Sequence, residues 1–211
     1  MHLTLLGATG PTGQLVLQQA LKAGHRVTAL VRDPARLPQR DDPDVTVVTG
    51  DATRTEDLTR AMTGSQAVVS ALGAGSARTS DLASRAAQAL VPAARATGVH
   101  RIVVLSAFGV GDTLQHYTAV PRTFVRLLLR GVFGDKAVAD ELLRGSGLDV
   151  TLVYPTILTK GPYTGTYTVI ETPGKKIGGR ISRADVADFM LRQVDSEEWS
   201  HRTAILTHRT H

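Results

Sequence analysis

The stretch Gly7-Ala8-Thr9-Gly10-Pro11-Thr12-Gly13 joins a mostly apolar run, His2–Leu6, to a segment with helical periodicity, Pro11–Ala23. Glycines at this spacing let the chain reverse, let the backbone approach a pyrophosphate and let the helix pack closely on the strand. The first helical turn offers free N–H groups to phosphates and tolerates a proline. A tight turn without a ligand is the alternative. The place of the motif after a first strand favours a cofactor site that includes Gly7, Thr9, Gly10, Pro11, Thr12 and Gly13.

Outward from this turn, short β-like runs alternate with helix-period segments, the pattern of parallel strands joined by crossover helices. The further strands are expected at Arg26–Val31, Val45–Val48, Ala67–Ser70, Arg101–Leu105, Asp149–Tyr154 and Thr203–Leu206. Helices are expected over Thr79–Thr97, Pro121–Arg130 and Asp135–Arg144. Two more are expected after capping signals: one from Thr53, where Thr53-x-x-Glu56 predicts a capping box, and one after Ser182-x-x-Asp185.

Residues 156–180 interrupt the alternation and predict a hairpin-like excursion, with Tyr163–Ile170 and Lys175–Ile177 around a Pro173-Gly174 turn. The chain is therefore expected to form one domain over residues 1–211. Its predicted fold class is α/β, a Rossmann-like doubly wound parallel sheet with helices on both faces and a small C-terminal hairpin on the substrate side.

The composition narrows the function classes. The chain has no cysteine, which excludes disulfides, thiolate metal sites and a cysteine nucleophile, and no other metal-ligand spacing is present. Its net charge of +5 is dispersed, which favours small phosphorylated molecules over nucleic acid as partners. No apolar run approaches the roughly 18 residues of a membrane span. Met1-His2-Leu3 leads straight into a strand, so we expect no signal peptide and a cytoplasmic location.

The end of the second strand indicates which cofactor binds. Enzymes that use NAD place a carboxylate there for the ribose hydroxyls, whereas those that use NADP place an arginine. Both occur, as Arg32 and Asp33, but Asp33 precedes Pro34 in a capping arrangement that gives its carboxylate a structural use. Arg36 lies nearby, and Arg32 could also be a solvated cation at the strand end. We favour NADP(H).

With these residues established, the chain resembles the atypical short-chain dehydrogenase/reductase family, in its NmrA-like NAD(P)H-binding branch. Within the branch it is most similar to the biliverdin IXβ reductases, also called flavin reductases. The matching stretches are GATGPTG at 7–13, VTALVRDP at 27–34, GD at 50–51, DELLRGSGLDVTLVYP at 140–155, GPYTGTYTV at 161–169 and ISRADVADFML at 181–191. Residues 73–135 match only loosely.

The resemblance implies roles for further residues. It places Arg32 at the 2′-phosphate, Asp51 and Ala52 beside the adenine, and Leu72 and Gly73 along the ribose. It places Ser106 at the nicotinamide region, bordered on the other side by Tyr154, Pro155, Thr156 and Ile157. Two residues have structural alternatives, because Asp51 could simply be a turn residue and Ser106 a strand-end hydroxyl that bonds backbone. These reductases carry a histidine near the position of Thr156, so no role of that histidine transfers.

The sequence lacks the acid of ordinary short-chain dehydrogenases, a tyrosine followed four residues later by a lysine. Residues four after Tyr117, Tyr154, Tyr163 and Tyr167 are Pro121, Leu158, Tyr167 and Glu171, and Lys136 has Val132 four before it. We therefore expect hydride transfer from NADPH to a planar conjugated acceptor, a flavin, tetrapyrrole or quinone, with Ser106 as the candidate catalytic residue. The alternatives are a non-catalytic NADP(H)-binding redox regulator and an epimerase or ketoreductase. The expected partner is a small molecule, and the expected state is a monomer or weak homodimer. His116-Tyr117 has no assigned role.

The assignment of Arg32 makes the first testable prediction. NADPH should bind more tightly than NADH, and Arg32→Glu should abolish or reverse that preference, because a charge-assisted contact of about 1.5–3 kcal/mol is lost. Fluorescence titration of both proteins with both cofactors measures the four dissociation constants. Equal constants for NADPH and NADH in the unmodified protein would contradict the assignment.

Overall fold

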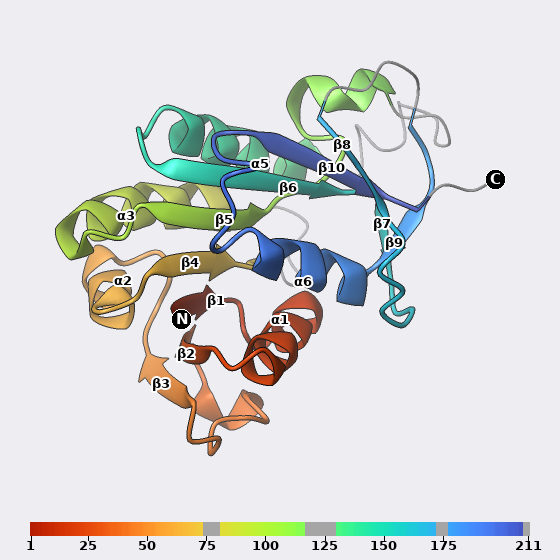
Figure 1. Cartoon of the computed structure of the whole chain (residues 1–211). Coiled ribbons are helices and arrows are strands. Elements are labelled where there is room, and N and C mark those ends of the chain that lie inside the picture. The colour runs from red at the N-terminus through yellow and green to blue at the C-terminus, as the bar shows by residue number, and fades with distance from the viewer. Residues whose placement is uncertain (74–80, 117–129, 172–176, 209–211) are drawn as a thin grey trace.

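The structure is a computed structural model, and it describes residues 1–73, 81–116, 130–171 and 177–208. Its eight-stranded sheet has the order β3-β2-β1-β4-β5-β6-β10-β8. All neighbours are parallel except β8, which pairs antiparallel with β10 (Figure 1). The strands are β1 His2–Leu6, β2 Arg26–Val31, β3 Val45–Thr49, β4 Ala67–Ser70, β5 Arg101–Leu105, β6 Asp149–Pro155, β8 Thr168–Ile170 and β10 Thr203–Thr207. The strands β7 Ile157–Thr159 and β9 Arg180–Ser182 form a separate parallel pair.

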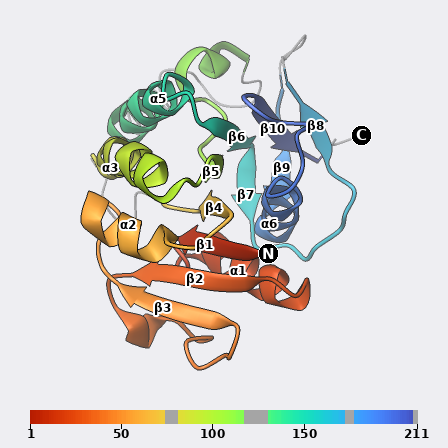
Figure 2. The ribbon, with the colours of Figure 1, turned by 60° about the vertical axis from the view of Figure 1, so that its left-hand side comes forward.

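Helices cover both faces of the sheet, as expected (Figure 2). On one face lie α1 Pro11–Lys22 and α6 Arg183–Arg192; on the other lie α2 Thr55–Met62, α3 Leu82–Thr97 and α5 Arg130–Arg144. A hydrophobic core lies on each face of the sheet, and successive residues of a strand pack alternately into one core and the other. Leu5 packs beneath α1, and Leu6 packs beneath α2 and α3. This alternation explains why the strands read as nearly continuous apolar runs. No helix in the described part of the chain has the length and apolar character needed to cross a membrane.

Three local expectations differ from the structure. The predicted capping box at Thr53 does not form, because both the amide and the hydroxyl of Thr53 donate to Asp51 Oδ1 at 2.9 Å and α2 begins only at Thr55. The helix α3 begins at Leu82, later than Thr79, which lies outside the described residues. The expected helix Pro121–Arg130 also lies almost entirely outside them, and α5 begins at Arg130 rather than Asp135.

Of the expected hairpin in residues 156–180, the structure describes the first arm, whereas most of the second arm, Lys175–Ile177, lies outside the described residues. The strand β8 leaves the excursion to extend the main sheet beside β10, and β7 pairs in parallel with β9. The Pro173-Gly174 turn lies outside the described residues. The first arm of the excursion thus pairs with the last strand of the chain, a partner that sequence proximity could not reveal.

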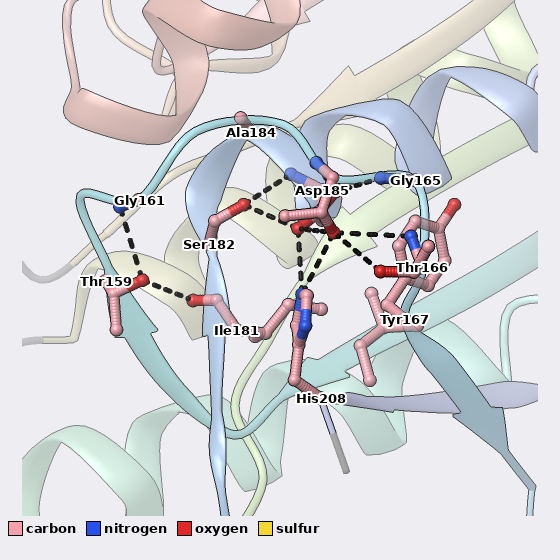
Figure 3. Close-up of polar contacts among 12 residues, drawn as sticks. Thr159, Gly161, Gly165, Thr166, Tyr167, Ile181, Ser182, Ala184, Asp185 and His208 are labelled. Atoms are coloured by element: carbon pink, nitrogen blue, oxygen red, sulfur yellow. Dashed lines mark hydrogen bonds and ion pairs between the residues drawn. The ribbon is translucent and has the colours of Figure 1, made fainter. Parts of the chain in front are cut away.

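A buried carboxylate, Asp185 of α6, holds the excursion against this helix (Figure 3). Asp185 accepts hydrogen bonds from the amides of Thr164 and Gly165, at 2.8 and 3.0 Å, and from Thr164 Oγ1 at 3.1 Å. It also accepts from Ser182 Oγ at 2.7 Å and lies 2.8 Å from His208 Nε2. The predicted cap is confirmed, since Ser182 Oγ accepts from the amide of Asp185 at 3.0 Å.

These donors set the ionisation of Asp185. Burial by itself would raise the pKa of this carboxyl, but the hydrogen bonds from Thr164, Ser182, Gly165 and His208 together lower it to about 2. Donors aimed at a carboxylate favour its charged form. The ionised side chain of Asp185 therefore connects β9, α6, the 164–165 turn and the residue that follows β10.

Replacing Asp185 with asparagine should destabilise the fold, because an amide has one acceptor oxygen and presents its NH₂ group to donors. We expect a loss of about 2–4 kcal/mol in the free energy of unfolding at pH 7. Since the folded pKa is lowered, this contribution is present above the unfolded value of 3.8 and is lost as the pH falls toward about 2. Urea unfolding at pH 7 and pH 3 tests this, with the exposed Asp41→Asn as a control. A loss at pH 3 as large as that at pH 7 would contradict the account.

Candidate functional site

A cavity of about 610 Å³ lies beside the glycine turn, at the carboxyl ends of β1, β2 and β4. The strand order reverses between β1 and β4, the switch point at which open α/β sheets bind their ligands. The lining includes Gly7, Thr9, Gly10, Pro11, Thr12, Arg32, Arg36, Asp51, Ala52, Thr53, Leu72, Gly73, Arg85, Leu105, Leu158 and Arg183. Ten residues predicted from sequence to contact a dinucleotide's phosphates, adenine and ribose thus line one cavity, namely Gly7, Thr9, Gly10, Pro11, Thr12, Arg32, Asp51, Ala52, Leu72 and Gly73.

The three glycines of the turn have different tasks. Gly7 has a φ of +79°, and a Cβ there would lie 2.7 Å from the carbonyl oxygen of Ala71. A Cβ on Gly13 would lie 2.0 Å from the oxygen of Gly7, so α1 can approach β1 only without a side chain at this position. Gly10 has an ordinary φ of −82°, and its nearest Cβ contact would be 3.3 Å. Gly7 and Gly13 therefore serve the fold, and Gly10 leaves space on the cavity side.

The N-terminus of α1 fits a pyrophosphate. Its N-cap residue, Gly10, has no side chain to accept the amides of the first turn, and Pro11 stands at the first position. Amides of a first helical turn have no carbonyl four residues earlier in the helix, so they remain available to an anion. The glycine cradle and these donors together suit a dinucleotide, although Gly13 contributes by packing rather than by lining the cavity.

Cations surround the part of the cavity assigned to the adenosine. Arg32 and Arg36 come from the end of β2, and Arg85 reaches over from α3 with Nη2 at 3.4 Å from Thr53 Oγ1. Asp33 is absent from the lining and instead caps a short 3₁₀ helix, η1 Pro34–Arg36, by accepting from the Ala35 amide at 3.0 Å. The structural use predicted for Asp33 is confirmed.

Asp51 combines two features that the sequence left as alternatives. Its carboxylate closes a turn by accepting the amide and hydroxyl of Thr53, and its side chain also lines the cavity. The backbone hydrogen bond from Thr53 lowers the pKa of Asp51, with additional effects of Arg32 and Arg85. The turn therefore presents an ionised carboxylate between two arginines.

The residues predicted around the nicotinamide are differently placed. Ser106 and Tyr154 turn their hydroxyls toward a buried carboxylate, Asp140 of α5, with distances of 2.6 and 2.7 Å to Oδ2. Thr156 is buried and donates to the carbonyl of Leu206 at 3.2 Å, whereas Ile157 is 42% exposed. None of Ser106 and Tyr154–Ile157 lines the 610 Å³ cavity, although Leu105 does. Their contact with a nicotinamide remains a prediction.

Tyr154 cannot replace the missing acid. Its side chain is 2% exposed, and burial together with Asp140 raises the pKa of the phenol above its usual value. Lys136 Nζ donates to the carbonyl oxygen of Leu105 at 3.1 Å, and burial lowers the pKa of this ammonium. A phenol that holds its proton and points at a carboxylate is not poised to protonate a substrate oxygen.

Sequence reasoning missed several members of the site. Arg85, Leu158 and Arg183 line the cavity from three different elements; Arg183 lies in the matching stretch 181–191, whereas no motif marks Arg85 or Leu158. Asp140 had one available signal: it follows Lys136 by four residues on a predicted helix, so the two share a face. In the described part of the chain, no cluster of three or more His, Asp or Glu residues could hold a metal ion.

Comparison with known proteins agrees with this geometry. The family model described as NAD(P)H-binding matches residues 7–197. The chain belongs to this NAD(P)H-binding family. An uncharacterised chloroplastic protein of Arabidopsis thaliana is 30% identical over 211 aligned residues, which cover 96% of this chain and 75% of the relative. The uncharacterised sugar epimerase YhfK of Bacillus subtilis is 27% identical, with coverage of 98% and 94%.

Solved structures share the fold. The oxidoreductase ylbE of Lactococcus lactis superposes with a TM-score of 0.85 at 20% identity, covering 100% of this chain and 92% of the other. ChuY of Escherichia coli, an anaerobillin reductase, gives 0.84 at 22% identity, with coverage of 100% and 98%. A short-chain dehydrogenase/reductase from Veillonella parvula in complex with NADP gives 0.80 at 20%, with coverage of 98% and 94%. The predicted Rossmann-like fold is thus confirmed, and the family model over residues 7–197 confirms the predicted NAD(P)H-binding family.

The different roles of the glycines can be tested directly. Gly10→Val should block NADPH binding, because the branched side chain occupies the space needed by the phosphates, and it should melt near the parent temperature, because its backbone angles are ordinary. Gly13→Val should unfold the protein, since its Cβ would meet the Gly7 oxygen at 2.0 Å. Thermal melts measure the stability of each variant, and NADPH fluorescence titration measures its affinity for the cofactor. A normally folded Gly10→Val protein with unchanged NADPH affinity would place the phosphate site elsewhere.

Proposed function

We propose that this member of the NAD(P)H-binding family is an NADPH-dependent reductase of a planar conjugated acceptor. The observation that carries the proposal is the state of Tyr154, whose phenol is buried beside the site and donates to Asp140 at 2.7 Å. The other tyrosines lack a lysine at the fourth following position. A simple ketone needs a proton donor at its developing alkoxide, whereas a flavin, tetrapyrrole or quinone spreads the incoming charge over its own ring.

The choice of NADPH over NADH rests on charge. Arg32 and Arg36 line the cavity at the end of β2, where a 2′-phosphate would lie, and Arg85 faces them from α3. The carboxylate at the end of β2 itself, Asp33, is occupied as a cap. Guanidinium groups suit phosphate oxygens because their donors form a rigid fork.

The chain's own contribution to catalysis is then positioning. NADPH, when bound, would supply the hydride. The glycine turn and the arginines would hold the dinucleotide, and the Leu105–Ser106 end of β5 would border the reacting region. A defined geometry between two bound reactants can supply much of the rate without an acid. The likeness in fold to ChuY, a reductase, and to ylbE, an oxidoreductase, supports this class of reaction.

One relative favours a second candidate. YhfK carries the description of a sugar epimerase and aligns over 98% of this chain at 27% identity. Epimerisation through a keto intermediate places a proton on carbon or oxygen next to the cofactor, and the residues that would do so, a tyrosine with its lysine, are missing here. The reductase therefore ranks first, followed by the epimerase and a non-catalytic NADP(H)-binding regulator.

An acceptor screen distinguishes these functions. Under anaerobic conditions, the protein should oxidise NADPH with FMN, riboflavin, biliverdin or quinones and show negligible oxidation with simple ketones, since a general acid typically supplies about 10²–10⁴-fold. Ser106→Ala should lower turnover by about tenfold or less. Brisk turnover of simple ketones would overturn the proposal. Tight NADPH binding without oxidation by any conjugated acceptor would favour the regulator instead.

A further inference from the structure

We propose that Arg183 binds an anionic substituent of the acceptor, so that the protein selects conjugated acceptors that carry a phosphate or a carboxylate. This inference rests on the proposed function and adds to it a class of acceptor and the residue that selects it. Arg183 is the first residue of α6, and its side chain lines the nucleotide cavity.

The pairing of β7 with β9 brings Arg183 to the cavity. Leu158 of β7 is the partner of Ile181, and Thr159 is the partner of Ser182, the residue before Arg183. The strand β9 leads directly into α6 at this point (Figure 1). The first residue of the helix therefore lies beside β7, and both Leu158 and Arg183 reach the cavity.

The order of the sheet places this end of the cavity away from the adenosine site. Arg32 follows β2, whereas Leu105 ends β5 and Leu158 lies just beyond β6. In the sheet, β2 lies on one side of β1, and β4, β5 and β6 lie on the other. Arg183 thus belongs to the half of the cavity where the nicotinamide and the acceptor are expected to meet.

Apolar side chains form the wall beside Arg183. Leu105 is 8% exposed, and Leu158 is partly buried and packs against the core beneath α1. Ligand sites combine apolar walls with a few polar groups that fix the orientation of the ligand. Two leucines and one cation fit a planar ring that carries an acidic substituent.

The guanidinium of Arg183 has no counter-ion in the described part of the chain. No hydrogen bond or ion pair engages it there, although its side chain is partly buried. The carboxylates of its own helix are engaged elsewhere, since Asp185 receives the donors described above and Asp188 lies 2.9 Å from Arg192 Nε. A partly buried charge without a partner is stabilised when a ligand supplies the opposite charge.

The acidic residues that line the cavity lie at its other end. Asp51 accepts the amide and hydroxyl of Thr53, and Asp81 lies 3.8 Å from Arg85 Nη1 at the start of α3. Neither carboxylate is paired with Arg183. The acceptor end of the lining is therefore positively charged, and a bound anion would meet a guanidinium whose rigid fork suits both phosphate and carboxylate oxygens.

Two pairs of probes isolate the charge of the substituent. FMN and riboflavin share one ring system and differ in a phosphate, and biliverdin and its dimethyl ester differ in their free propionate carboxylates. Flavin fluorescence and tetrapyrrole absorbance titrations, with the protein saturated with NADP⁺, measure binding without turnover. The parent should bind the anionic member of at least one pair about tenfold more tightly than the neutral member. The pair that discriminates identifies the anion as phosphate or carboxylate.

Variants of Arg183 should change this discrimination and little else. Arg183→Gln should weaken binding of the anionic probe by about tenfold and leave the neutral probe within about twofold, whereas Arg183→Lys should retain most of the preference because it keeps the charge. The NADPH dissociation constant of Arg183→Gln should stay within about twofold of the parent value. Arg192→Gln is a matched control, since it removes the same charge from the same helix outside the cavity lining.

The outcomes separate this inference from the proposed function. Equal affinity for both members of each pair, or a preference that Arg183→Gln retains, would overturn the role of Arg183 and leave the reductase intact. An equal loss of NADPH affinity in Arg183→Gln would overturn it as well, because the guanidinium would then bind the cofactor. A parent that binds FMN or biliverdin through Arg183 but oxidises NADPH with no acceptor would support the anion site and remove the reductase.

Discussion

The close approach of α1 to β1 is the constraint on which the rest of the molecule depends. Gly13 touches the backbone of Gly7 at a distance that excludes any side chain, and Gly7 lies against the carbonyl of Ala71 with a positive φ. Together these contacts draw the end of β4 and the start of α1 around one turn. The cavity opens beside that turn because backbone, rather than side chain, faces it. The same close packing that seals the two-sided core therefore creates the binding surface for a dinucleotide.

Two buried aspartates show how the number of donors sets the charge of a carboxyl group. Asp185 and Asp140 have 0% and 2% exposure, so both lose contact with water. Asp185 is surrounded by donors from Thr164, Gly165, Ser182 and His208, and its pKa falls to about 2. Among the described residues, Asp140 receives hydrogen bonds from the hydroxyls of Ser106 and Tyr154, and burial raises its pKa. The first carboxylate holds the excursion between β7 and β9 in place, and the second joins α5 to the ends of β5 and β6.

Much of the fold was readable from the sequence because its signals are local. The boundaries of β1 and β2, the glycine turn, the Asp33 cap and the Ser182 cap each depend on residues within a few positions of one another. The expectations that failed or were incomplete depend on contacts that the local sequence pattern does not encode. The Thr53 capping box failed because Asp51 engages Thr53 first, and the pairing of β8 was not foreseen because its partner, β10, lies about 35 residues later in the chain.

The sequence by itself predicted a dinucleotide site at residues 7–13 and the capping use of Asp33, and it determined that no tyrosine is followed by a lysine four residues later. Only the tertiary structure brought Arg85, Leu158 and Arg183 to the cavity, since each comes from an element that is distant in sequence from the glycine turn. It alone also placed Ser106, Asp140 and Tyr154 together, because β5, α5 and β6 meet only after the sheet is wound. Short stretches of sequence determine local backbone conformation, whereas the pKa of a side chain and the residues it contacts depend on the elements that pack around it.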